Sequence, residues 1–330
     1  MKNKSISRRK FIGDAVKSSA AIAALGFMGS CSLFDGKKSI PRRTLGKTGL
    51  EASILSFGGG SQFMKNMKGD WEKLMELAID NGINLFDTAP SYSGFKLPGQ
   101  DMGSEERFGA ILPKYRDKIL LSTKLETRDP KKVKSEIQAS LSSLKTDYID
   151  IYLIHAIDDK DDVGDIEKGI YKEMQQLKKA GIVRYIGFSS MSSAQRSKDL
   201  LENLDIDVAM LAMNPTRYGD YAKVALPSAI KQKSGVIAIK AMRNIVGKEA
   251  TAKELMEYNL DHEGVATNMI AHDGMNPLKD NIQLAQNYQG QQLAYNHRQD
   301  LESRMAKYSG PHALCWARPG YVDGGTYYWA

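Results

Sequence analysis

Four polar side chains at or near the ends of short apolar runs have the types that proton transfer needs. Asp87, Lys124 and His155 each close such a run, and Tyr92 follows Asp87 in the next loop. A tyrosine has a pKa of about 10, and a neighbouring ammonium group lowers it by stabilising the phenolate. We therefore expect Asp87 to hold Lys124 beside Tyr92, and His155 to orient a substrate oxygen or share its proton.

Other kinds of chemistry fit these residues poorly. None of the four is a nucleophile with a general base beside it, and His155 lacks companion metal ligands, so we expect no metal site. Cys31 and Cys315 are the two cysteines, too few for a disulfide framework or a cysteine-rich metal site. Each residue alone has an ordinary structural explanation, but together they favour reduction of a carbonyl group.

The elements that position these residues are alternating strands and helices. Apolar runs predict strands over 53–60, 84–88, 119–124, 149–155, 185–190, 208–214, 236–242 and 264–271. Helical spacing predicts helices over 71–81, 104–114, 130–144, 166–180, 192–203, 221–234, 251–260 and 277–287. This order predicts an α/β protein, a (β/α)₈ TIM barrel with a C-terminal extension, whose active site lies at the carboxyl ends of the strands. A doubly wound sheet is the alternative, but the glycines at 58–60 lack the later glycine of a dinucleotide-binding loop.

Four motifs resemble successive signatures of the aldo-keto reductases. They are Arg-Thr-Leu-Gly-Lys-Thr-Gly-Leu at 43–50, Asn-Leu-Phe-Asp-Thr-Ala-Pro-Ser-Tyr at 84–92, Ser-Thr-Lys at 122–124 and Asp-Tyr-Ile-Asp-Ile-Tyr-Leu-Ile-His at 147–155. The resemblance covers about residues 40–288. It implies a barrel that reduces a small aldehyde or ketone, sugar-derived in one interpretation, with NAD(P)H. It also implies a catalytic tetrad of Asp87, Tyr92, Lys124 and His155, with Tyr92 as the proton donor.

The same resemblance assigns residues to the nicotinamide end of the cofactor, with departures from the family pattern. Ser189 and Ser190 stand where the family has Ser-Asn after the fifth strand. Met210 stands where the sixth strand has Gln, and Lys240 takes the place of an aromatic residue at the seventh. These departures remove polar contacts to the nicotinamide amide.

At the adenine end, Asp280 and Asn281 resemble the Glu-Asn pair of the family. The family's arginine for the 2′-phosphate falls at Pro277, so a bidentate phosphate clamp is lost there. We expect NADP as the cofactor, with NAD as the alternative. Because the nicotinamide contacts are degraded, two further functions stay open: a cofactor-binding scaffold or sensor with little turnover, and an epimerase or dehydrogenase that keeps its cofactor bound.

The first thirty residues resemble a twin-arginine export signal. Arg8 and Arg9 precede an apolar run at 18–29 that is too short to span a bilayer, and Cys31 follows in a context that resembles a lipobox. The alternatives are an amphipathic helix and an ordinary buried cysteine. We therefore predict a removed signal at 1–30, a linker at 31–40, a barrel at 41–290 and an aromatic extension at 291–330. Passage through the export machinery predicts location in the periplasm or cell envelope, with a lipid anchor at Cys31.

The net charge and the C-terminal extension give two further expectations. The formal net charge is +7, and residues 1–30 contribute +5 of it, so no basic stripe remains and nucleic-acid binding is excluded. The extension is rich in Tyr and Trp, which predicts a flap packed over the barrel rim or a lid over the substrate. Its aromatic residues are Tyr295, Tyr308, Trp316, Tyr321, Tyr327, Tyr328 and Trp329.

Overall fold

The computed structural model describes residues 38–93, 101–290, 293–321 and 323. The predicted export signal, Cys31 and the aromatic residues at 327–329 lie outside the described residues. From Lys38 onward the described residues belong to one compact unit. Among them, no helix is both long and apolar enough to span a membrane.

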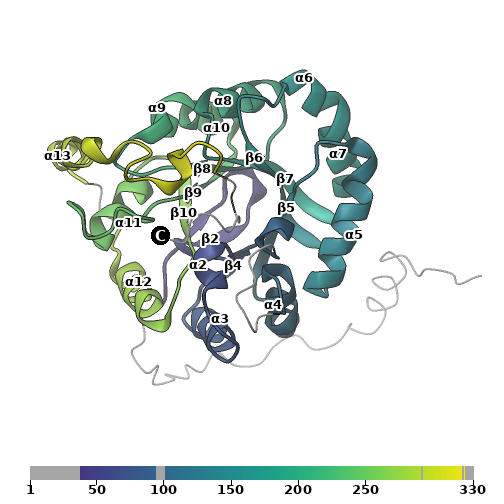
Figure 1. The fold of residues 1–330 in the computed structure, drawn as a ribbon, viewed down its shortest axis with the longest axis horizontal. Helices are drawn as coiled ribbons and strands as arrows, with labels where there is room; N and C mark the ends of the chain where they lie inside the picture. The colour runs from purple at the N-terminus through teal and green to yellow at the C-terminus, as the bar shows by residue number, and fades with distance from the viewer. Residues whose placement is uncertain (1–37, 94–100, 291–292, 322, 324–330) are drawn as a thin grey trace, which may run out of the picture. The chain divides into compact units, whose positions relative to one another are not determined.

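Eight parallel strands close into a barrel, as predicted (Figure 1). Around the barrel the order is β10, β3, β4, β5, β6, β7, β8 and β9, so that sequential strands are neighbours and the last pairs with the first. Their bounds are β3 Leu55–Gly58, β4 Leu85–Asp87, β5 Leu120–Leu125, β6 Ile149–Ile157, β7 Val183–Ser190, β8 Val208–Ala212, β9 Gly235–Ile239 and β10 Val265–Ile270.

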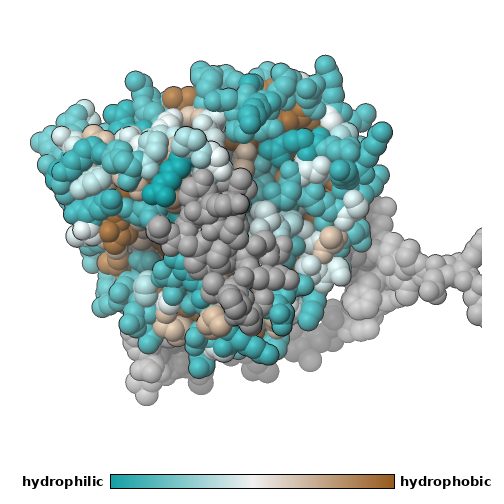
Figure 2. Space-filling model, viewed as in Figure 1, coloured by the Kyte–Doolittle hydropathy of each residue, from teal (hydrophilic) through white to brown (hydrophobic). Residues whose placement is uncertain are grey.

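Helices surround the barrel and connect successive strands (Figure 1). They are α2 Ser61–Met64, α3 Asp70–Asp80, α4 Ser104–Ile111, α5 Val133–Leu144, α6 Val163–Ile166, α7 Lys172–Lys179, α8 Ala194–Asn203, α9 Tyr221–Val224, α10 Leu226–Gln232, α11 Ala252–Leu260 and α12 Met275–Asn287. Two of the predicted helices are each divided in the structure. A distorted turn at Gly169 lies between α6 and α7, and Ala225 separates α9 from α10. On the face seen in Figure 2 most side chains are hydrophilic, and apolar ones form small groups.

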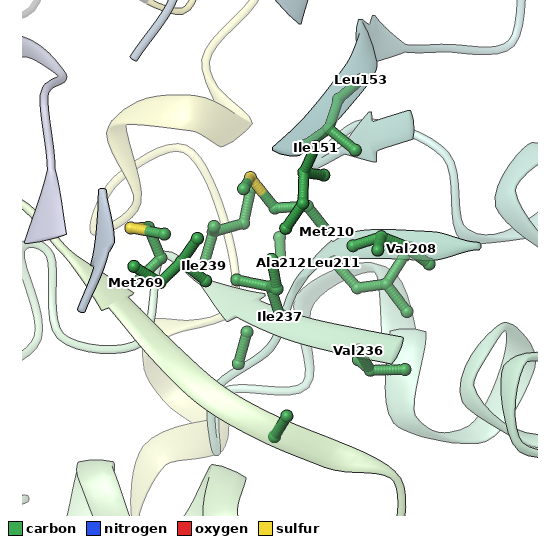
Figure 3. Close-up of a cluster of buried hydrophobic side chains, with 14 of the residues drawn as sticks. Ile151, Leu153, Val208, Met210, Leu211, Ala212, Val236, Ile237, Ile239 and Met269 are labelled. Carbon is green, nitrogen blue, oxygen red and sulfur yellow. The ribbon is translucent and has the colours of Figure 1, made fainter. Parts of the chain in front are cut away.

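Apolar side chains from neighbouring strands fill the space that the barrel encloses and the layer beneath the helices. Figure 3 shows one part of this core, where Ile151 of β6, Met210 of β8, Ile237 of β9 and Met269 of β10 contribute buried side chains. The β7–β8 pair needs glycine at 187, because a Cβ there would lie 1.8 Å from the carbonyl oxygen of Val208. This packing makes a rigid support for side chains at the strand ends.

A short hairpin precedes the barrel at the amino-terminal ends of its strands. It consists of β1 Arg42–Thr44 and β2 Glu51–Ser53, which pair antiparallel. The connection includes Leu45, which is fully buried against Gly235 at the start of β9, and Gly46, whose φ of +52° favours glycine. The hairpin thus lies at the end of the barrel opposite the strand ends that carry the predicted chemistry.

The C-terminal extension contains a helix that the sequence pattern did not predict, α13 Tyr295–Met305. Its weak apolar periodicity explains the omission, since Leu301 and Met305 are its two buried residues. Further along, Cys315 and Trp316 are buried with the core. In Figure 1 the yellow end of the ribbon reaches the face of the barrel beside β8 and β9.

Candidate active site

The four residues predicted to act together do lie together. Asp87 ends β4 and Lys124 lies near the end of β5, and these parallel neighbours bring the Lys124 Nζ to 2.6 Å from the Asp87 Oδ2. Tyr92 lies in a short 3₁₀ turn, Pro90–Ser93, and its ring centre is 4.7 Å from the Lys124 Nζ. His155 of β6 packs edge-on against Tyr92, with ring centroids 5.7 Å apart. All four side chains are buried.

Hydrogen bonds hold the ion pair in one orientation. The Lys124 Nζ also donates to the Thr88 carbonyl oxygen at 2.7 Å, and the Ser122 hydroxyl donates to the second oxygen of Asp87 at 2.8 Å. Charge-assisted bonds of this kind are short and strong, and a buried pair persists only when its remaining hydrogen-bonding groups are satisfied. Lys124 is therefore a fixed cation under the Tyr92 ring, as the sequence predicts.

The acidity of Tyr92 differs from the expectation. Burial raises the pKa of Tyr92 well above its usual value, and the negative charges of Asp323 and Asp87 raise it further. The expected lowering by Lys124 does not prevail in this state, because Asp87 neutralises that ammonium while Asp323 lies directly at the phenol. Tyr92 is thus a neutral hydrogen-bond donor, and its hydroxyl donates to the Asp323 Oδ2 at 3.0 Å.

His155 has a partner that the sequence analysis missed. Both carboxylate oxygens of Glu126 lie 2.8 Å from the His155 Nδ1, and the backbone N–H of Ser91 donates to the same carboxylate at 3.3 Å. Burial lowers the pKa of His155, but hydrogen bonds to Asp323 and Glu126 more than offset this, so that its pKa is raised. Burial likewise raises the pKa of Glu126, and its bonds to His155 and Ser91 bring it down to about 2. Both shifts favour the charged forms, an imidazolium beside a carboxylate.

Asp323, from the C-terminal extension, is the second residue that the sequence analysis missed. Besides the bond from Tyr92, its carboxylate lies 3.5 Å from the His155 Nε2. The other oxygen accepts from the Lys240 Nζ at 2.7 Å and from the Tyr321 hydroxyl at 2.8 Å. Burial raises the pKa of Asp323, but Lys240 and His155 bring it well below its usual value. No motif could have predicted this contact, since Asp323 is far in sequence from every residue it touches except Tyr321.

A cavity of about 610 Å³ extends from this cluster. Ser190 does not line it: the Ser190 hydroxyl donates to the Ile157 carbonyl oxygen at 2.8 Å and lies 3.0 Å from the Tyr221 hydroxyl. The Ser189 hydroxyl accepts from the backbone N–H of Ala156, directly after His155. Of the residues that the sequence analysis assigned to catalysis or cofactor binding, those on the cavity wall are Asp87, Tyr92, Lys124, Ser189, Met210, Lys240, Asp280 and Asn281.

The far end of the cavity offers polar groups for a nucleotide. The Asn281 amide donates to the His272 Nε2 at 3.1 Å, and burial lowers the pKa of His272 to about 3, so its neutral ring carries the proton on Nδ1. That Nδ1 is buried without a hydrogen-bond partner among the described residues, on a residue of the cavity wall. Cavities of this volume hold cofactors, and a buried N–H without a partner is a place for a ligand's acceptor atom. The residues present therefore fit a dinucleotide, although Pro277 supplies no phosphate clamp.

Among the described residues, no group of three or more His, Cys, Asp or Glu side chains is arranged to hold a metal ion.

The fold and the site together define a (β/α)₈ barrel protein with a Tyr-Lys-Asp-His cluster beside a nucleotide-sized cavity. The chain belongs to the aldo/keto reductase family, whose sequence profile matches residues 55–245. That span contains the whole tetrad.

Comparisons with individual proteins agree with this assignment. The aldo-keto reductase YhdN of Bacillus subtilis is 34% identical over 168 residues, which cover 46% of this chain and 47% of that protein. The NADPH-dependent codeinone reductase 1-1 of Papaver somniferum is 29% identical over 54% of this chain and 59% of its own length. The matches thus span about half the length of these curated relatives. A crystal structure of a putative aldo-keto reductase from Pseudomonas aeruginosa is 25% identical, with a TM-score of 0.63, and covers 76% of this chain and 97% of that one.

Proposed function

We propose that this protein reduces the carbonyl group of a small aldehyde or ketone to an alcohol with NAD(P)H, and that the Tyr92 hydroxyl is the proton donor. One observation carries the proposal. The Tyr92 hydroxyl and the His155 Nε2 lie 3.0 and 3.5 Å from a single oxygen, the Asp323 Oδ2. A carbonyl oxygen in that position would meet the same two groups, with the Lys124–Asp87 pair behind Tyr92.

The chain's residues divide the work. Ser189 and Met210 would hold the nicotinamide end of the cofactor, and Asp280 and Asn281 the adenine end; when bound, the cofactor supplies the hydride. Tyr92 donates its proton to the carbonyl oxygen as negative charge develops there. The Lys124 ammonium stabilises the phenolate that remains. A substrate that displaces Asp323 also removes one of the charges that raise the pKa of Tyr92, which makes the phenol a better acid.

His155 acts on the same oxygen from the other side. Its Nδ1 is occupied by Glu126, which leaves the Nε2 for the substrate oxygen. The raised pKa of His155 favours the imidazolium form, whose Nε2–H donates to that oxygen. A charged donor stabilises developing oxyanion character more than a neutral one does. His155 therefore orients the carbonyl and shares its charge, while Tyr92 transfers the proton.

Removal of the Tyr92 hydroxyl group tests the proposal. In Tyr92→Phe the ring still fills its place, but the acid is gone, so kcat for 4-nitrobenzaldehyde with NADPH should fall about 10² to 10⁴-fold. Fluorescence titration should show that NADPH binding stays within about threefold of the unmutated protein. Tyr115→Phe, in the turn after α4, serves as a control because Tyr115 does not line the cavity. Unchanged turnover in Tyr92→Phe would remove Tyr92 from the mechanism.

We also propose NADP as the cofactor, with NAD as the alternative, and a location in the cell envelope. The name of the Papaver relative, which includes NADPH, supports the first. Arg8, Arg9 and the short apolar run after them support the second. A lipid anchor at Cys31 would keep the exported barrel at a membrane surface.

A further inference from the structure

The carboxylate of Asp323 occupies the place that a substrate oxygen would take. Its Oδ2 accepts from Tyr92 at 3.0 Å and lies 3.5 Å from the His155 Nε2, while its Oδ1 accepts from Lys240 at 2.7 Å. These three groups come from the loop after β4, from β6 and from the residue that directly follows β9. The Asp323 carboxylate therefore connects the proton donor, Tyr92, to Lys240, a cation outside the tetrad.

Lys240 is built into this position. It directly follows β9 with a φ of +59°, a left-handed conformation that costs energy for a residue with a side chain. The Asn214 amide donates to its carbonyl oxygen at 3.2 Å, which helps to fix that conformation. The Lys240 side chain is 9% exposed. Backbone strain of this kind persists where the surrounding structure enforces it, commonly at functional sites.

Lys240 depends on Asp323 for its counter-charge, whereas the other basic groups of the site have acidic partners of their own. The Lys124 ammonium is paired with Asp87, and the His155 imidazole with Glu126. Among the described residues, Asp323 is the ion-pair partner of Lys240. A substrate that reached Tyr92 would have to displace the Asp323 carboxylate, and Lys240, a cation on the cavity wall, would then lose its counter-charge. Such a state is costly unless the incoming molecule brings an anion.

We infer that the substrate is a carbonyl compound with a carboxylate on the adjacent carbon, a 2-oxo acid. In the substrate-free protein, the Asp323 carboxylate occupies the position that this substrate would take. The substrate's carbonyl oxygen takes the position of the Asp323 Oδ2, at Tyr92 and His155, and its carboxylate takes that of the Oδ1, at Lys240. This inference rests on the proposed reduction and names its substrate class. Lys240 is then a residue that determines specificity.

An anion could also reach Lys240 from the phosphates of a bound nucleotide, so the test separates the two sources. Pyruvate and pyruvamide have the same skeleton and differ in one charge. The unmutated protein should reduce pyruvate with a kcat/KM at least tenfold above that for pyruvamide. In Lys240→Met, which removes the ammonium group and keeps an unbranched side chain one atom shorter, this ratio should fall about 10 to 100-fold, as expected for a charge-assisted contact. The affinity for NADPH should change by less than threefold.

The control is Lys253→Met on α11, an exposed lysine outside the cavity, which should leave the pyruvate to pyruvamide ratio unchanged. If Lys240→Met weakens NADPH binding as much as it lowers pyruvate turnover, Lys240 serves the nucleotide and the inference is wrong. Reduction of 4-nitrobenzaldehyde without a preference for pyruvate over pyruvamide would also overturn it, while leaving the proposed function intact.

A binding experiment needs no turnover and tests the role of Asp323. Oxamate carries a carboxylate beside a carbonyl, and oxamide is its neutral counterpart. Calorimetry should show that oxamate binds more tightly than oxamide, that Lys240→Met removes the difference, and that Asp323→Asn tightens oxamate binding about tenfold by weakening the competing contact. Equal binding of oxamate and oxamide, or weaker oxamate binding in Asp323→Asn, would contradict the inference even if the protein reduced no carbonyl at all.

Discussion

The carboxylates around Tyr92 and His155 govern where the protons lie in this site. Asp323 and Asp87 add to the effect of burial and raise the pKa of Tyr92, whereas Glu126 and Asp323 raise the pKa of His155 against the effect of burial. Lys124, the residue that sequence reasoning credits with tuning Tyr92, is already neutralised by Asp87. The same residue types can thus produce opposite shifts, depending on which charges lie nearest.

Removal of the Glu126 charge should lower the pKa of His155. In Glu126→Gln burial still disfavours the imidazolium, but the negative charge at the Nδ1 is gone. With ¹³C-labelled histidine, the NMR titration of the Cε1–H resonance should move to lower pH in Glu126→Gln. The matched control is Glu105→Gln: Glu105 is also buried and accepts from the Thr123 hydroxyl at 2.6 Å. An unchanged His155 titration in Glu126→Gln would show that Glu126 does not set its charge.

The signs of the two shifts also predict how this pair affects stability. The pKa of His155 is raised, so its contribution is complete below the unfolded value of about 6.5 and is lost as pH rises through the folded pKa. The pKa of Glu126 is lowered to about 2, so its contribution is present above the unfolded value and is lost as pH falls toward 2. The pair therefore stabilises the fold most around weakly acidic pH.

Among the secondary-structure elements, the ends of the parallel strands are what allow the sequence to predict the positions of site residues. Apolar runs with polar ends placed Asp87, Lys124 and His155 correctly, because neighbouring parallel strands bring their carboxyl ends together. Glu126 follows Lys124 by two positions, and the alternation of side chains along a strand could have placed both on one side. Asp323 and α13 could not be predicted in this way, since no periodic pattern connects them to the barrel.

One residue assigned to the cofactor, Ser190, has its hydroxyl group bonded away from the cavity. Ser190 lies in β7 like Ser189, but alternation turns successive side chains to opposite faces, and the Ser190 hydroxyl bonds to the Ile157 carbonyl oxygen and lies beside Tyr221. A family motif read residue by residue does not show this difference. The assignment of Ser190 to the cofactor stays a prediction, which the geometry does not favour.

Helix α12 should set the preference between the two nucleotides. Pro277 lies in its first turn on the cavity wall, where the family pattern has an arginine for the 2′-phosphate, and Asp280 adds a negative charge one turn later. Fluorescence titration should therefore show NADPH binding more tightly than NADH by far less than a thousandfold, a factor worth about 4 kcal/mol. A preference of a thousandfold or more would mean that other residues clamp the phosphate.

For the whole molecule, residues 1–30 carry +5 of the net charge of +7, which supports the proposed export signal. Beyond the inner membrane no pool of reduced nucleotide is replenished, so an exported reductase has to carry its cofactor and regenerate it with a second substrate. A twin-arginine signal allows this, because that pathway takes proteins that are already folded. Closure of the barrel over the nucleotide would then precede transit.

Substitution of both arginines tests the export prediction. Arg8→Lys together with Arg9→Lys should retain the protein in the cytoplasm, whereas Lys2→Arg with Lys4→Arg, outside the arginine pair, should leave its distribution unchanged. Cell fractionation measures both, and protein purified from the envelope should contain nicotinamide nucleotide. Envelope protein that is empty and exchanges micromolar nucleotide within milliseconds would contradict the carried-cofactor account.

In the proposed reaction, hydride passes from the cofactor to a carbonyl carbon while Tyr92 supplies the proton. A single-turnover reaction with NADPH that carries deuterium on the transferable position tests it most directly, with mass spectrometry of the alcohol formed from 4-nitrobenzaldehyde and from pyruvate. We predict one deuterium on the former carbonyl carbon, formed by the unmutated protein and about 10² to 10⁴-fold more slowly by Tyr92→Phe. An alcohol without deuterium, or no alcohol while the nucleotide is firmly bound, would contradict the account and favour a protein that binds the cofactor without turning it over.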